Sequence, residues 1–277
     1  MKLILLIAGC VLAAEFLRWL HVRLRPVPVL MYHFIDGQGE RRGLSVSLSN
    51  FEQHLKYLMK HNFRVVSADE FLQASQTGTR LPQNSVMITF DDGDEAFYTK
   101  VYPLLLKYQI PATVFVISGW VDRPGFLSWR QIRIMSSELV TVGSHTSSHR
   151  YLPDLPLDEV KKELAESKQS LEMELKRSVS FLSYPVGGFT PDIARTAKEA
   201  GYMAAFTTNR GQNFWQRDLF ALKRVKMTDR STRPHVLWAK YSGYYQILNE
   251  LRPKSTGGNG RKGAGMAAAE ATVNDQN

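Results

Sequence analysis

The sequence predicts a single α/β domain, a (β/α) barrel of about seven parallel strands. Three observations predict it. Short β-rich runs alternate with segments of helical periodicity through most of the chain. The run SVMITF at 85–90 is almost continuously apolar, as expected of a parallel strand that is covered on both faces. The alternation repeats about six or seven times, and that count favours a barrel over an open sheet.

The expected elements follow one another as strand and helix, with the strands rich in β-branched and aromatic residues. The expected strands cover 27–35, 64–67, 85–90, 112–118, 139–145, 178–185 and 203–208. Helices are expected over 49–63, 68–75, 95–108, 129–135, 157–175 and 191–200. Ser49 and Glu52 have the spacing of a capping box at the start of the first helix, and Ser67 and Glu70 repeat it at the second.

The two ends of the chain are expected to lie outside the barrel domain, which we place at 26–251. Residues 1–25 combine a short apolar run with small residues, which predicts a signal peptide or membrane anchor. Ile7–Cys10 is also similar to a bacterial lipoprotein processing site, where Cys10 would carry the lipid; an uncleaved anchor and a helix packed on a cytosolic domain are the alternatives. Residues 252–277 contain almost no bulky apolar side chains, which predicts a disordered tail. We therefore expect an exported protein, in the bacterial cell envelope or outside it, associated with the membrane through 1–25.

Charge argues against a nucleic-acid partner, and cysteine content excludes an intrachain disulfide. The formal net charge is +9, from 35 Lys and Arg against 26 Asp and Glu, but no basic block with interleaved aromatic residues occurs. Nucleic acid is therefore not an expected partner. Cys10 is the single cysteine, so an intrachain disulfide is excluded.

Polar residues follow four of the expected strands, at the point where each strand ends. They are His33, Asp91–Gly93, His145–His149 and Tyr184–Gly188. The carboxyl ends of the strands of a (β/α) barrel form one rim, which carries the active site in enzymes of this fold. We therefore expect these groups to meet at that rim.

The two histidines and the two carboxylates suit a metal site with catalytic function. His145 and His149 are four residues apart and can face one point, and with one carboxylate they make a three-ligand site that leaves positions open for water. A divalent cation would also offset the repulsion between Asp91 and Asp92, with one carboxylate ligating and the other free to accept a proton. Each motif alone is more often an ordinary turn or a pair of surface histidines, so the prediction depends on all of them occurring together at strand ends.

These motifs resemble those of a known family. Thr89–Gly93, followed by His145–His149 and then Tyr184–Gly187, is similar to the polysaccharide deacetylases, the carbohydrate esterase family of chitin, peptidoglycan and poly-N-acetylglucosamine deacetylases. The similarity covers about 26–227. It implies a distorted (β/α) barrel, a divalent metal cofactor with zinc as the first expectation, and an N-acetylated polysaccharide as substrate.

The resemblance also implies roles for individual residues. Asp92, His145 and His149 correspond to the metal ligands, and Asp91 corresponds to the general base. The backbone N–H of Tyr184 would help to stabilise the oxyanion that forms on the acetyl carbonyl.

Two departures from the family pattern affect the acid and the support of the base. The family's third motif has an arginine that orients the base, but this chain reads Phe181–Tyr184 there. The late Leu-x-His motif that supplies the general acid has no clear copy, although His235 is an alternative. The branch that deacetylates poly-β-1,6-N-acetylglucosamine is similar to this chain in having a histidine on the first strand, so His33 is the expected acid. Arg224 is similar to a late arginine of that branch and could support Asp91.

The sequence therefore predicts a metal-dependent hydrolase that removes N-acetyl groups from a polysaccharide containing N-acetylglucosamine, in the cell wall or an exopolysaccharide. A metal hydrolase of the same fold that acts on another ester or amide is one alternative, and a membrane-attached glycan-binding protein with decayed catalysis is another. Trp120, Trp129 and Trp215 are candidates for stacking on sugar rings, or else core or rim aromatics.

Overall fold

The computed structural model describes residues 27–37, 43–209, 213 and 218–243. The predicted signal or anchor at 1–25, the predicted tail at 252–277 and Trp215 lie outside those residues, so the predictions made for them stay predictions. Among the described residues, we find no helix whose length and apolar character would allow it to cross a membrane.

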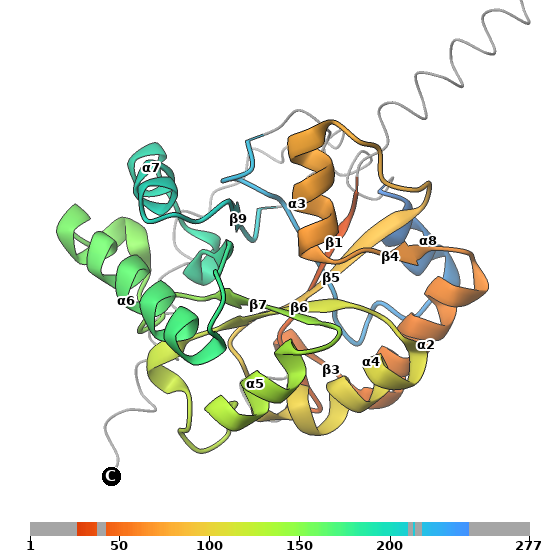
Figure 1. Cartoon of the computed structure of the whole chain (residues 1–277). Coiled ribbons are helices and arrows are strands. Elements are labelled where there is room, and N and C mark those ends of the chain that lie inside the picture. Colours follow the sequence, from red (N-terminus) through yellow and green to blue (C-terminus); the bar gives the residue numbers. More distant parts are fainter. Residues whose placement is uncertain (1–26, 38–42, 210–212, 214–217, 244–277) are drawn as a thin grey trace, which may run out of the picture.

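The described chain alternates strands and helices through most of its length (Figure 1). The strands are β1 (Val29–Tyr32), β2 (Phe34–Ile35), β3 (Ser45–Val46), β4 (Arg64–Val65), β5 (Ser85–Phe90), β6 (Ala112–Val116), β7 (Val140–Ser144), β8 (Phe181–Ser183), β9 (Ala204–Phe206) and β10 (Val225–Lys226). The helices are α2 (Leu48–Lys60), α3 (Ala68–Thr77), α4 (Tyr102–Tyr108), α5 (Trp129–Ser136), α6 (Leu157–Leu175), α7 (Pro191–Glu199) and α8 (Pro234–Ser242). A π-helical turn, Phe97–Val101, leads directly into α4, and short 3₁₀ turns occupy Ser118–Trp120, Leu152–Asp154 and Pro185–Gly187.

The main sheet is parallel and curled into a distorted barrel, as the sequence predicts. Its strand order is β10-β1-β5-β6-β7-β8-β9, and β4 adds to β5 off this path. The segment 219–226 lies between β9 and β1 and contacts both strands. Leu222 pairs with Phe206 of β9, and Val225 and Lys226 pair with Leu30 and Met31 of β1. Helices cover the outside of this sheet, with α6 and α7 lying side by side at the end formed by β7, β8 and β9 (Figure 1).

Side chains of the sheet alternate between the inside of the barrel and the helix-covered outside. Met87 belongs to an inner cluster with Phe115, Phe181 and Phe206, whereas its neighbour Ile88 belongs to the outer cluster beneath the helices. By the same alternation, Asp91 lies on the inner face, in line with Met87. The inside of the barrel is therefore apolar along the strands. At the carboxyl end of β5 it carries an acidic group, Asp91.

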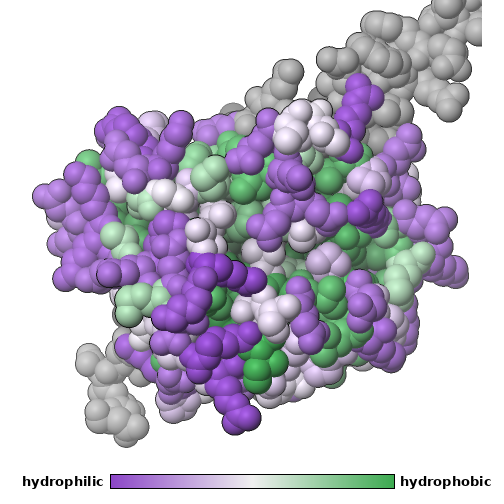
Figure 2. Space-filling model, in the orientation of Figure 1, coloured by the Kyte–Doolittle hydropathy of each residue, from purple (hydrophilic) through white to green (hydrophobic). Residues whose placement is uncertain are grey.

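The outer faces of the helices are hydrophilic. Figure 2 shows polar residues around the periphery of one face, with apolar residues gathered nearer its centre. In α6 the buried positions recur at three- and four-residue spacing, at Val160, Glu163, Leu164, Ser167 and Leu171. This pattern is that of an amphipathic helix packed on a sheet, and two polar residues, Glu163 and Ser167, lie within its buried stripe.

Most expected elements are present, with small differences at their ends. The capping box at Ser67 and Glu70 is confirmed at the start of α3. The one predicted at Ser49 is wrong, because α2 starts at Leu48 and its N-cap is Ser47, whose hydroxyl accepts the N–H of Asn50. The sequence pattern did not predict β3, β10 or α8.

Candidate active site

The candidate catalytic residues lie at the carboxyl ends of neighbouring parallel strands. His33 follows β1, Asp91 and Asp92 follow β5, and His145 follows β7. β1 pairs with β5, and β6 lies between β5 and β7, so these strand ends come together on one rim of the barrel. Groups that are far apart in the sequence therefore meet there, as expected from the fold.

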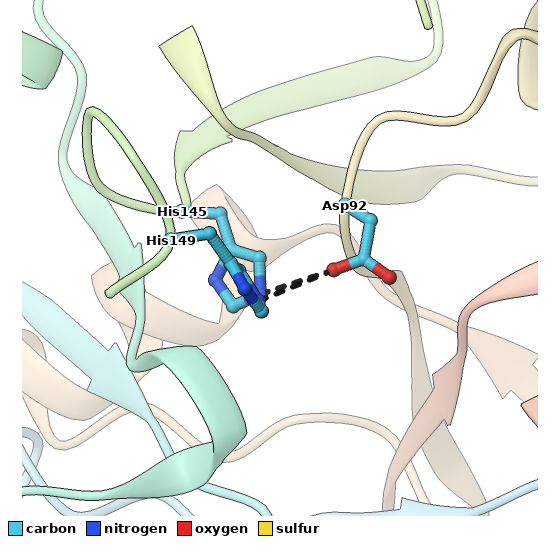
Figure 3. A group of neighbouring side chains, drawn as sticks. All are labelled: Asp92, His145 and His149. Carbon is cyan, nitrogen blue, oxygen red and sulfur yellow. Dashed lines mark ion pairs between the residues drawn. The ribbon is translucent and has the colours of Figure 1, made fainter. Parts of the chain in front are cut away.

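Asp92, His145 and His149 form a compact group. Each offers one ligand atom, and these atoms lie within 4.8 Å of one another. The Nε2 atoms of His145 and His149 are 3.4 Å and 3.6 Å from the same oxygen, Oδ1 of Asp92. Figure 3 shows the two imidazoles directed at that carboxylate. The side chains of His145, His149 and Asp92 are only 2%, 8% and 14% exposed.

This donor set fits a divalent metal ion. Two imidazole nitrogens and a carboxylate oxygen are ligands of catalytic zinc, and two ligand atoms bound about 2.0–2.2 Å from one tetrahedral ion lie roughly 3.4 Å apart. Nδ1 of His145 donates to the carbonyl of Ser183 at 2.7 Å, so Nε2 is the nitrogen left to face Asp92. The structure thus brings together the three residues predicted as ligands, in an arrangement that one ion could occupy.

Burial and charge favour the ionisation states that metal ligands need at Asp92 and His149. At His145 burial acts to lower the pKa, but the carboxylates of Asp92 and Asp91 outweigh it and raise that pKa. Burial alone would raise the pKa of Asp92, but the imidazoles of His145 and His33 outweigh burial and hold that pKa well below its usual range. Burial and the neighbouring His145 lower the pKa of His149 to about 4. Asp92 is therefore a carboxylate and His149 a neutral imidazole at pH 7.

Asp91 lies beside this group and is held by an arginine. Nη1 and Nη2 of Arg224 donate to Oδ1 and Oδ2 of Asp91, each at 2.7 Å. Arg224 is 0% exposed and Asp91 is 2% exposed. Burial acts to raise the pKa of Asp91, but the guanidinium outweighs it and lowers that pKa. Asp91 is thus an ionised, oriented carboxylate adjacent to Asp92, the candidate ligand.

Arg224 reaches this position from the segment that leads into β10. Its guanidinium carbon lies 5.6 Å and 6.0 Å from the ring centres of Phe115 and Phe206, so it covers the apolar interior of the barrel. It also donates to the hydroxyl of Ser183 at 2.8 Å. This chain has no arginine at Phe181–Tyr184, where the family's third motif would supply one, and Arg224, some forty positions later, holds Asp91 instead. A guanidinium that donates two N–H groups to one carboxylate makes a strong bidentate pair.

His33 belongs to the same site, whereas His235 does not meet it. Nε2 of His33 lies 3.9 Å from Oδ2 of Asp91, and the His33 side chain is 13% exposed. Burial lowers the pKa of His33, although the carboxylates of Asp92 and Asp91 act in the opposite direction. His235 is exposed on α8, and none of the hydrogen bonds or ion pairs of the described site involves it.

The backbone N–H of Tyr184, predicted as an oxyanion donor, is engaged in the sheet. It donates to the carbonyl of Phe206 at 3.0 Å. The Tyr184 side chain is buried, and its hydroxyl donates to the carbonyl of Phe220 at 3.1 Å. This hydrogen bonding counts against the predicted role, because an N–H that already has a partner in the sheet is poorly available to a substrate.

Two of the candidate stacking residues are in the described chain. The ring of Trp120 lies 5.8 Å from that of His149 and 5.1 Å from that of Phe126. Trp129 begins α5 and packs against the outer core. Of these two tryptophans, Trp120 is the one that contacts a residue of the site.

Comparison with known proteins gives one consistent result. Residues 78–205 match the family model described as polysaccharide deacetylase. The chain is 31% identical over 189 residues to the poly-β-1,6-N-acetyl-D-glucosamine N-deacetylase of Staphylococcus aureus, a match that covers 63% of this chain and 65% of that one. The chain thus spans slightly less than two thirds of the length of that relative.

Two solved structures extend the likeness to the fold. The deacetylase PplD of Streptococcus pyogenes, determined with acetate, has a TM-score of 0.72 and 25% identity, over 83% of this chain and all (100%) of that one. A protein of Bacillus anthracis that is provisionally named a polysaccharide deacetylase has a TM-score of 0.69 and 30% identity, over 79% of this chain and 69% of that one.

Proposed function

The chain belongs to the polysaccharide deacetylase family, and we propose that it removes N-acetyl groups from a polysaccharide that contains N-acetylglucosamine. The observation that carries this proposal is that two groups with different chemical roles lie together in one buried site. One is a three-residue metal-ligand group, and the other is an ionised carboxylate clamped by Arg224. Hydrolysis of an amide needs both activation of water and acceptance of its proton.

Asp92, His145 and His149 would hold the ion, for which zinc is our first expectation. When bound, a divalent ion would supply Lewis-acid chemistry, lowering the pKa of water and polarising the acetyl carbonyl. The ring of His145 is held in place by the carbonyl of Ser183, which accepts its Nδ1–H.

Asp91 would accept the proton of the attacking water. Its two oxygens are fixed by Arg224, so the carboxylate keeps one orientation and stays ionised until it takes the proton. Since Asp91 is adjacent in sequence to the ligand Asp92 but outside the ligand group, it can act as base while Asp92 ligates.

His33 would give a proton to the leaving nitrogen. The water oxygen adds to the acetyl carbon, the carbon–nitrogen bond breaks, and the nitrogen needs a proton to leave as an amine with acetate as the other product. His33 lies 3.9 Å from Asp91, so the proton that Asp91 takes from the water can pass through His33 to the leaving nitrogen. The histidine on the first strand, rather than His235, is therefore our assigned acid.

The poly-β-1,6-linked glycan is the substrate we expect first, because the S. aureus relative is named for it. The test is acetate release by the full chain from β-1,6- and β-1,4-linked N-acetylglucosamine oligomers and from acetylated xylan. We expect release from N-acetylglucosamine oligomers, fastest with the β-1,6 linkage, and a fall of about 100-fold or more in His33→Ala. His235→Ala is the matched control and should retain the wild-type rate. Release from xylan alone would contradict the proposal.

A further inference from the structure

Helix α6 carries a buried glutamate that faces the loop between the two histidine ligands. We propose that Glu163 is a positioning residue that holds this loop, residues 145–149, in the shape that binds the metal. The inference rests on the metal site proposed above and adds to it a group from outside the sequence motifs.

The carboxylate of Glu163 accepts three hydrogen bonds from that loop. Its Oε2 accepts the backbone N–H of Ser147 at 3.0 Å and that of Ser148 at 2.9 Å. Its Oε1 accepts the hydroxyl of Ser148 at 2.5 Å. These donors lie between His145 and His149, so one carboxylate connects the middle of the loop to a helix 15 residues further along.

The position of Glu163 is unusual for an acidic residue. It is 8% exposed and lies in the buried stripe of α6, in register with Val160, Leu164 and Leu171. A buried carboxylate destabilises a fold unless hydrogen bonds compensate it. The three hydrogen bonds from the loop provide that compensation, so the carboxylate and the loop stabilise each other.

The loop needs such support because its backbone is strained. Thr146 has φ +65° and His149 has φ +61°, both in the left-handed region that residues with a Cβ rarely adopt. Strained backbone of this kind persists where surrounding contacts fix it. A second contact from α6 acts on the same loop, since the hydroxyl of Ser167 hydrogen-bonds Ser144, whose hydroxyl accepts the N–H of Thr146.

The consequence concerns the histidine ligands. His145 and His149 direct Nε2 at one oxygen of Asp92 only if the loop keeps its turn. With Glu163 in place, the site is arranged before the ion arrives, and binding does not have to order the loop. Partners that orient metal ligands in this way typically change metal affinity by about 10–100-fold.

The test separates the reach of the side chain from its charge. Glu163→Asp keeps the charge but withdraws the carboxylate by one methylene, and we expect zinc affinity to fall by about 10–100-fold in competition with a chromophoric chelator. Glu163→Gln keeps the reach, because its carbonyl can accept both N–H groups while the Ser148 hydroxyl turns to accept its amide. We expect it to bind zinc within a few-fold of wild type. The absorption spectrum of bound Co²⁺ should change in Glu163→Asp and not in Glu163→Gln.

Glu172→Asp is the matched control. Glu172 lies on the same helix and also accepts a backbone N–H, that of Val179 at 2.9 Å, but in a different loop. We expect this variant to lose thermal stability and to keep wild-type zinc affinity. Wild-type zinc affinity and Co²⁺ spectrum in Glu163→Asp would overturn the inference, as would equal affinity losses in Glu163→Asp and Glu172→Asp. A wild-type chain that binds zinc and releases no acetate would overturn the proposed function and leave this inference standing.

Discussion

Asp91→Asn is expected to lower acetate release by about 10²–10⁴-fold while zinc binding stays intact. The amide keeps the shape of the carboxylate but cannot accept the proton of the attacking water. The three candidate ligands are unchanged, because Asp91 lies outside the group formed by Asp92, His145 and His149. The measurement is the rate of acetate release together with zinc content per chain.

His145→Ala is the comparison for this prediction. It removes a ligand whose Nε2 faces Asp92 at 3.4 Å, so zinc content and activity should fall together. Equal loss of zinc in Asp91→Asn and His145→Ala would contradict the division between base and ligand.

Arg224→Met is expected to destabilise the fold by about 3–5 kcal/mol, the usual cost of removing one partner of a buried ion pair. Arg224 is fully buried, and both oxygens of Asp91 accept its N–H groups at 2.7 Å. Without the guanidinium, the Asp91 carboxylate is left buried and uncompensated. The measurement is the free energy of unfolding by denaturant.

Two further variants make this prediction specific. Arg195→Met removes an arginine that is 61% exposed and pairs with Asp192 on the surface of α7, and it should cost less than about 1 kcal/mol. The double variant Asp91→Asn with Arg224→Met removes both buried charges, so its destabilisation should be smaller than the sum of the two single values. Additive values would show that the two charges do not stabilise each other.

The sequence predicted the barrel because its signals are local and repeated. The apolar run at β5 and the alternation of strands with amphipathic helices both come from packing a parallel sheet between layers. The candidate ligand group was predictable for a related reason. Its residues lie in the segments that follow β5 and β7, and parallel strands bring their carboxyl ends to one rim. A strand of two residues, such as β10, has no periodic pattern, and it could not be predicted from periodicity.

The residues that sequence reasoning placed less well depend on contacts that no local pattern specifies. Arg224 was suggested only by family likeness, since nothing in its own segment indicates that its guanidinium will lie against Asp91. The role of the Tyr184 N–H could not be judged without knowing that Phe206 accepts it across the sheet. Glu163 was missed altogether, although an acidic residue in the apolar stripe of a helix is a signal that could have been read.

The most direct test of the central claim is the dependence of acetate release on zinc. The full chain would be stripped with a chelator, zinc would be added back in steps, and acetate release from β-1,6-linked N-acetylglucosamine oligomers would be measured at each step. We expect no release without metal, a linear rise, and a plateau at about one ion per chain, as a single three-ligand site requires. Undiminished release from the metal-free chain would contradict the account.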